Sequence, residues 1–113
     1  MKKLKLTRDE DAWLQAYRRA LAAQHPGAVS QLLIYGSKAR GTAHAESDLD
    51  VLLIVKNEAA ARKRDLRRIG YLLAATSDAV PSIFAYTEDE WESRRRRGST
   101  FRRAVERDAV SVL

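Results

Sequence analysis

The chain has 113 residues, enough for one domain with a single hydrophobic core and too few for a second domain beside it, so we expect residues 1–113 to form one unit. Its 21 Lys and Arg outnumber its 15 Asp and Glu, and the resulting net charge of +6 would attract a polyphosphate ligand or nucleic acid. It has no cysteine, which excludes disulfides and thiolate catalysis. It has no apolar run near the roughly 18 residues of a membrane span and no signal-peptide segment, so we expect a cytoplasmic protein without a membrane partner.

The first predicted helix begins at a capping box. Thr7 is placed to accept from the backbone amide of the third helical residue, and Glu10 is placed to reach back to Thr7. Apolar residues then recur at helical spacing until His25-Pro26-Gly27 ends the pattern. This stripe predicts a helix that faces the core, and its members are Trp13, Ala16, Tyr17, Ala20 and Leu21.

A buried strand from Val29 to Tyr35 leads directly into a candidate phosphate-binding turn. Gly36 has no Cβ, so backbone N–H groups there can approach a ligand closely. Ser37 adds a hydroxyl and begins a short helical turn that ends at Arg40, and the free N–H groups of such a turn favour anions. The turn therefore predicts a seat for the β- and γ-phosphates of a nucleoside triphosphate.

The side chains of this turn have different expected roles. Arg40 can contact a phosphate or pair with a carboxylate, and the sequence leaves both alternatives open. Lys38 is expected to be exposed to solvent. Ser47, at the end of the loop that follows, is expected to cap the next turn and not to contact substrate.

Two aspartates stand at the head of the next predicted strand, which runs from Asp48 to Val55. Because successive side chains on a strand alternate, Asp48 and Asp50 point to the same face. Magnesium is typically held by one or two carboxylates, with water and substrate phosphates completing its octahedron. Asp48 and Asp50 are therefore the candidate metal ligands and catalytic residues, with Mg²⁺ or Mn²⁺ as the cofactor.

The second half of the chain predicts three more helices and two more strands. Asn57 is expected to cap a helix that continues to about Ala75 and buries Leu66, Ile69 and Leu73, and Thr87 and Glu90 form a second capping box. The remaining elements are a strand from Val80 to Tyr86, a helix from the second capping box to about Arg97, a helix from Thr100 to Arg107 and a strand from Ala109 to Val112. Together these elements predict an α/β fold, a mixed sheet of about four strands with helices packed on it.

Four consecutive arginines, Arg94 to Arg97, end the helix that the second capping box begins. They could bind RNA phosphates or the acidic face of a partner. Positive charge in the last turn of a helix also complements the helix dipole, as Glu88 to Glu90 do at its start. The second interpretation is favoured, so nucleic acid is not the preferred partner.

The stretch from Gly36 to Val55 resembles the active-site motif of the nucleotidyltransferase superfamily that includes DNA polymerase β, and within it the minimal nucleotidyltransferase group. The resemblance implies that a hydroxyl attacks the α-phosphorus of a nucleoside triphosphate, with pyrophosphate leaving. It implies that Asp48 and Asp50 hold the metal and that Gly36, Ser37 and Arg40 bind phosphates.

The family has a third carboxylate on the neighbouring strand, where counting along this chain places Ser82. Asp78 lies on the same face by the period of two, and it is either a third ligand or a turn residue. The loss of a third acid leaves open one tightly held metal, weak catalysis, or binding without turnover.

Two hypotheses of function follow. In the first, the protein transfers AMP from ATP to a hydroxyl of a partner protein; minimal nucleotidyltransferases often act as antitoxins that modify a small helical toxin of the HEPN class. In the alternative, the site is degenerate, and the protein neutralises or scaffolds a partner by binding alone. Transfer to the hydroxyl of a small antibiotic is disfavoured, because it ordinarily needs a second domain to hold the acceptor.

Overall fold

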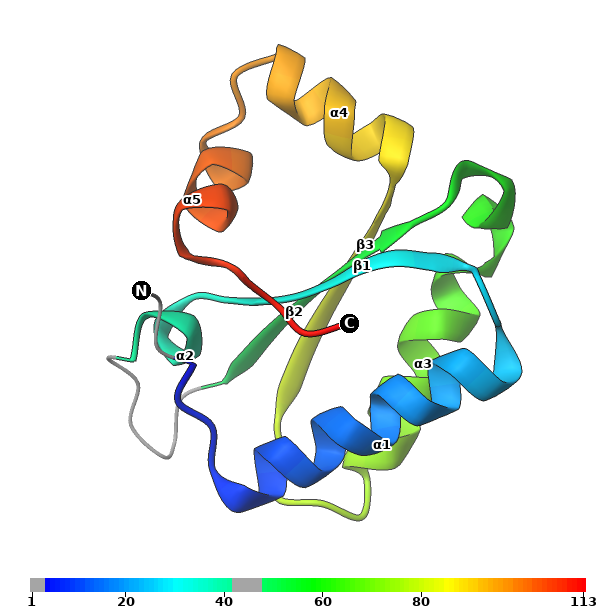
Figure 1. Ribbon diagram of the computed structural model, residues 1–113, viewed down its shortest axis with the longest axis vertical. Helices are drawn as coiled ribbons and strands as arrows, with labels where there is room; N and C mark the ends of the chain where they lie inside the picture. The colour runs from blue at the N-terminus through cyan, green and yellow to red at the C-terminus, as the bar shows by residue number, and fades with distance from the viewer. Residues whose placement is uncertain (1–3, 42–47) are drawn as a thin grey trace.

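A single mixed sheet organises the fold, as Figure 1 shows for the computed structural model, which describes residues 4–41 and 48–113. The strand order is β3-β2-β1-β4, with β1 antiparallel to both of its neighbours and β2 parallel to β3. The strands are β1 (Val29–Tyr35), β2 (Leu49–Val55), β3 (Pro81–Thr87) and β4 (Val110–Ser111). The predicted α/β fold with a mixed four-stranded sheet is confirmed.

Helices cover both faces of this sheet (Figure 1). The lower face in the view packs against α1 (Arg8–Gln24) and α3 (Lys63–Ala74), and the upper face packs against α4 (Glu88–Arg96) and α5 (Thr100–Asp108). The alternation of side chains along β2 explains the two layers. Val51, Leu53 and Val55 join the cluster of Trp13, Tyr17 and Leu66, whereas Leu52 and Ile54 join that of Trp91 and Val105.

Both predicted capping boxes are present. Thr7 accepts a hydrogen bond from the amide of Glu10 at 3.1 Å, and the Glu10 carboxylate accepts from the amide of Thr7 at 2.9 Å. Thr87 and Glu90 form the same pair of bonds at the start of α4. The helices α1 and α4 therefore begin where the sequence predicted, because their first-turn amides are satisfied locally, and α5 also begins at the predicted Thr100.

The prediction for Asn57 is wrong. The chain first forms a 3₁₀ helix, η1 (Asn57–Arg62), and α3 begins only at Lys63. Asn57 does not cap its own helix: its Oδ1 accepts a hydrogen bond of 3.0 Å from the amide of Asp89, in the first turn of α4. The first-turn amides of a helix have no partner within the helix, so a nearby side-chain oxygen from another element can satisfy one of them.

Within the described ranges, every helix is too short or too polar to cross a bilayer. The loop predicted before Asp48, with Ser47, lies outside the described residues.

Candidate active site

The turn after β1 and the head of β2 meet at Gly36 and Asp50. The antiparallel register pairs Tyr35 with Asp50, so the residue that follows β1 lies beside the aspartate. Gly36 has φ +74°, a conformation that L side chains rarely adopt, and a Cβ built on it would lie 2.3 Å from Oδ2 of Asp50. Glycine is therefore required at this position both by the backbone conformation and by the closeness of the carboxylate.

Asp48 and Asp50 lie close enough for their charges to interact. Burial raises the pKa of the partly buried Asp50 carboxyl above its ordinary value, the negative charge of Asp48 raises it further, and the guanidinium of Arg40 opposes both. Tyr35 lies on the same face of the sheet, and burial together with the Asp50 charge raises the pKa of its hydroxyl. The exposed Asp48 and the partly buried Asp50 thus repel each other, and a cation bound nearby would relieve this repulsion.

The donor set at this position fits a hard divalent cation. Both groups are carboxylates, and their mutual repulsion is what bound Mg²⁺ or Mn²⁺ would relieve. Among residues 4–41 and 48–113, no three acidic or histidine side chains come together as a metal site. Asp78 therefore does not join Asp48 and Asp50, and it lies exposed in the turn before β3.

Ser82 is the residue beside Asp50 on the neighbouring strand. The parallel register of β2 and β3 pairs Asp50 directly with Ser82, as counting along the strand predicted. A serine hydroxyl thus lies beside Asp50 at the strand position where the resemblance implies a third carboxylate. A neutral hydroxyl adds no negative charge, so a cation bound here would meet the charges of Asp48 and Asp50 alone among these three residues.

Lys38 is buried, and the prediction that it is exposed is wrong. Its side chain is 2% exposed, and its Nζ lies 3.0 Å from Oε1 of Glu10 at the start of α1. The carbonyl of Lys38 also accepts a hydrogen bond of 2.8 Å from the amide of Lys5. The residue turns inward because a buried carboxylate on α1 is available to its charge, and the pair fastens the α2 turn (Ser37–Arg40) to α1.

Arg40 pairs with a carboxylate, one of the two alternatives that the sequence left open. Its Nη1 donates to Oδ2 of Asp108, the last residue of α5, at 3.2 Å. The adjacent Arg107, and then Arg40, hold the pKa of the Asp108 carboxyl below its usual range. The Arg40 side chain remains half-exposed and its charge still acts on Asp50, so it lies near enough to the site for a phosphate to compete for it.

Sequence reasoning missed three residues that shape this site: Glu10, Tyr35 and Asp108. Tyr35 could have been found, because it ends β1 next to Gly36 and the hairpin register places it opposite Asp50. Glu10 has a recognisable role in its capping box, and no sequence pattern indicates that it also pairs with Lys38. Asp108 is separated from Arg40 by 68 residues, and no local pattern connects the two.

Comparisons with known proteins identify the class of domain. A search of curated proteins gave no match. A solved structure from Sulfolobus solfataricus, described as a candidate nucleotidyltransferase, aligns over 95% of this chain and 87% of its own, with 18% identity and a TM-score of 0.48. The nucleotidyltransferase domain family matches residues 14–105, a range that contains the Gly36 turn, both aspartates and Ser82. The chain belongs to the nucleotidyltransferase domain family.

Proposed function

We propose that this protein is a metal-dependent nucleotidyltransferase that transfers AMP from ATP to a hydroxyl on a partner protein. The observation that carries the proposal is the contact between the two halves of the motif. The Asp50 carboxylate occupies the space that a Cβ on Gly36 would need, and the charge of Asp48 acts on it. The closeness of the Gly36 turn to the two carboxylates supports binding of a nucleoside triphosphate together with a divalent cation.

The α2 turn and the two aspartates would bind different parts of the substrate. Gly36, Ser37 and Arg40 would bind the β- and γ-phosphates, and Asp48 and Asp50 would hold Mg²⁺, or Mn²⁺ in its place. A cation bound there would neutralise charge on the triphosphate and on the attacking oxygen. Another nucleoside triphosphate could replace ATP, because none of these contacts involves the base.

The transfer exchanges one bond to phosphorus for another. The acceptor oxygen forms a bond to the α-phosphorus while the bond from that phosphorus to the α–β bridging oxygen breaks. Pyrophosphate leaves with the electron pair, and the hydroxyl proton passes to water. The chain's own residues bind and orient the triphosphate and hold its negative charge in place.

The acceptor hydroxyl is proposed to belong to a partner protein. The resemblance to minimal nucleotidyltransferases supports a small helical partner of the HEPN class, which would make this chain the antitoxin of the pair. The net charge of +6 also suits an acidic partner. The acceptor hydroxyl would then be a serine, threonine or tyrosine of that protein.

A binding module without turnover is the second candidate, and one observation favours it. Ser82 stands beside Asp50 where a third carboxylate would bind metal. With only two acids, the site could hold a nucleotide and fail to activate the acceptor. The protein would then act on its partner by surface contact alone.

Transfer of label separates the two candidates. The purified chain is incubated with extract of the source cell, α-labelled ATP and Mg²⁺ or Mn²⁺, beside the variants Asp48→Asn and Asp50→Asn. We expect one labelled protein with the native chain and none with either variant, all three having the same circular dichroism spectrum. Absence of label with the folded native chain at every metal concentration would select the binding module.

A further inference from the structure

One side of the candidate site is open, along the outer strand β3. Ser82, Phe84 and Tyr86 pair with Asp50, Leu52 and Ile54, so all of these side chains share one face of the sheet. Leu52 is fully buried, whereas Phe84 on the outer strand is 45% exposed. Residues two apart on a strand are separated by about 6.6 Å, so Tyr86 lies roughly 13 Å from Ser82 along this face.

The direction of the reaction assigns this open side to the acceptor. In phosphoryl transfer, the attacking and leaving oxygens lie roughly in line on opposite sides of the phosphorus. The leaving pyrophosphate belongs to the Gly36 turn, which follows β1, and β1 and β3 flank β2 on opposite sides. An acceptor that attacks from the opposite side therefore approaches over Ser82 and Phe84.

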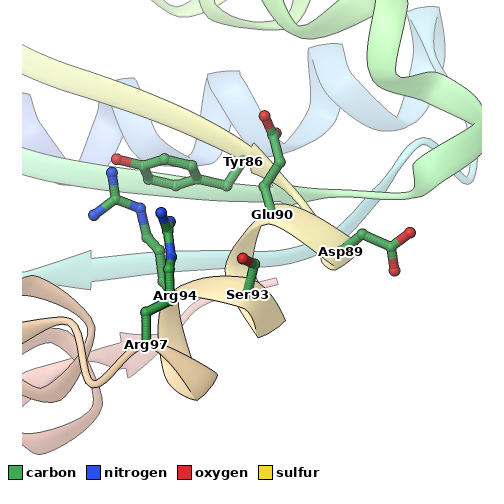
Figure 2. Close-up of a pocket in the computed structure, with 6 residues that line it drawn as sticks. All are labelled: Tyr86, Asp89, Glu90, Ser93, Arg94 and Arg97. Atoms are coloured by element: carbon green, nitrogen blue, oxygen red, sulfur yellow. The ribbon is translucent and has the colours of Figure 1, made fainter.

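A charged pocket of about 370 Å³ lies farther along the same face (Figure 2). Figure 2 shows the side chains of Arg94 and Arg97 extending toward Tyr86. Arg94 is held in place by aromatic rings, because its Cζ lies 4.6 Å from the centroid of Tyr86 and 5.6 Å from that of Phe101. The remaining lining residues are Asp89, Glu90 and Ser93.

The acids of this pocket leave its two arginines available. Glu90 already accepts from Lys63 at 2.8 Å and from the amide of Thr87 at 2.8 Å. The Asp89 side chain points away from the arginines in Figure 2. Among the described residues, the ion pairs of this helix join Glu90 to Lys63 and Glu92 to Arg95 and Arg102, and none of them includes Arg94 or Arg97. Two guanidinium groups thus face a cavity with no carboxylate paired to them in the described part of the chain.

The edge of β3 itself is closed to strand addition. Pro81 has no N–H to donate, and the amide of Ile83 donates to the hydroxyl of Tyr71 at 2.9 Å. A peptide therefore lies over the face of β3 and does not extend the sheet.

Resting on the function proposed above, we infer that the acceptor is an acidic peptide segment of a partner protein. The acceptor serine, threonine or tyrosine of this segment lies over Ser82 and Phe84. A carboxylate about four residues from the acceptor along the peptide, at some 3.3 Å per residue, enters the pocket of Arg94 and Arg97. The pocket favours a single carboxylate over a phosphate backbone, because Asp89 and Glu90 are also among its lining residues and their negative charge disfavours a continuous run of phosphates, even with Glu90 paired to Lys63.

Peptide binding to the full chain tests this inference. The probe is a fluorescent peptide of about twelve residues with one tyrosine and one glutamate about four residues to each side of it, so that either direction of the peptide brings one carboxylate to the pocket at about 3.3 Å per residue. The comparison peptide has glutamine in place of both glutamates. We expect the acidic peptide to bind at least about tenfold more tightly, the difference that one or two charge-assisted hydrogen bonds produce.

Matched variants locate the binding surface. Arg94→Ala/Arg97→Ala should abolish the preference for the acidic peptide, and Arg97→Ala alone should reduce it without disturbing the rings that hold Arg94. Phe84→Ala should weaken binding of both peptides. Arg64→Ala/Arg68→Ala removes the same charge from the exposed face of α3 and should leave the preference intact.

Equal affinity for the two peptides, or equal loss in the two double variants, would overturn the inference. Tighter binding of single-stranded RNA with the same dependence on Arg94 and Arg97 would also overturn it and assign the surface to nucleic acid. Titration of the same proteins with Mg·ATP separates this result from failure of the proposed function. If the chain binds the acidic peptide as predicted but does not bind Mg·ATP, the result supports the peptide-binding surface and contradicts the proposed transferase function.

Discussion

The carboxylate of Asp50 occupies the space that a side chain on Gly36 would need, with Oδ2 2.3 Å from the position of an ideal Cβ. The glycine of the phosphate turn and the second aspartate therefore depend on each other. A substitution at either position changes the other, and this coupling is open to direct tests.

Gly36→Ala should cost both stability and nucleotide binding. The alanine would adopt φ +74° and would also displace Asp50, so we expect the free energy of unfolding in urea to fall by about 3 kcal/mol. Gly27→Ala is the matched control, because Gly27 has φ +75° with nothing within 4 Å of the ideal Cβ position, and it should cost only about 1 kcal/mol. Equal losses in the two variants would show that Asp50 moves freely away from the turn.

Lys38→Met should destabilise the protein strongly. Glu10 would be left buried without the charge that lies 3.0 Å away, and breaking a buried ion pair costs about 3 kcal/mol or more. The double variant Lys38→Met/Glu10→Gln should recover part of this loss, because glutamine also serves in a capping box. Urea unfolding of the native chain, Lys38→Met, Glu10→Gln and the double variant measures the coupling. A loss below about 1 kcal/mol in Lys38→Met would contradict the burial of this pair.

Much of this architecture could be predicted from the sequence, because its signals are local. The capping boxes at Thr7 and Thr87 satisfy amides three residues away, and the strands β1 and β2 are marked by short apolar runs within seven residues. The pairing of Asp50 with Ser82 followed from counting along predicted strands. Signals of this kind need no knowledge of which elements pack together.

The errors share one cause, which is a polar side chain whose partner is distant in sequence. Lys38 was expected to be solvated because its partner Glu10 is not among its neighbours in the sequence. Asn57 looked like the cap of its own helix, yet its oxygen accepts from Asp89, 32 residues away. The pairing of Arg40 with Asp108 could be stated only as an open alternative. Such contacts follow from the tertiary fold and not from local propensity.

Arg40→Ala and Asp108→Asn should have different effects on nucleotide affinity. If Arg40 exchanges Asp108 for a phosphate, its removal deletes a charge-assisted hydrogen bond and should weaken Mg·ATP binding about tenfold. Asp108→Asn releases Arg40 from its carboxylate partner and should not weaken binding. Calorimetric titration measures both, and equal losses would show that the pair only holds α5 against the turn.

Ser82→Asp should strengthen metal binding. The new carboxylate would lie beside Asp50 in the strand register and supply the third acid of the site. We expect tighter Mn²⁺ binding in the presence of ATP and faster transfer, together with lower stability of the metal-free protein, because three like charges would then repel one another. Ser82→Asn is the control of equal size and no charge. Unchanged metal affinity in Ser82→Asp would place Ser82 outside the metal site.

Transfer of a nucleotide to a protein hydroxyl can be distinguished from other uses of ATP by parallel reactions with ATP labelled at the α- or the γ-phosphorus. The native chain, Mg²⁺ and source-cell extract should yield one protein band labelled from α-labelled ATP and not from γ-labelled ATP, and the band should be absent with Asp50→Asn. Label from the γ-phosphorus would indicate a kinase reaction. No label from either, with the native chain folded and bound to Mg·ATP, would contradict the transferase and leave a nucleotide-binding module.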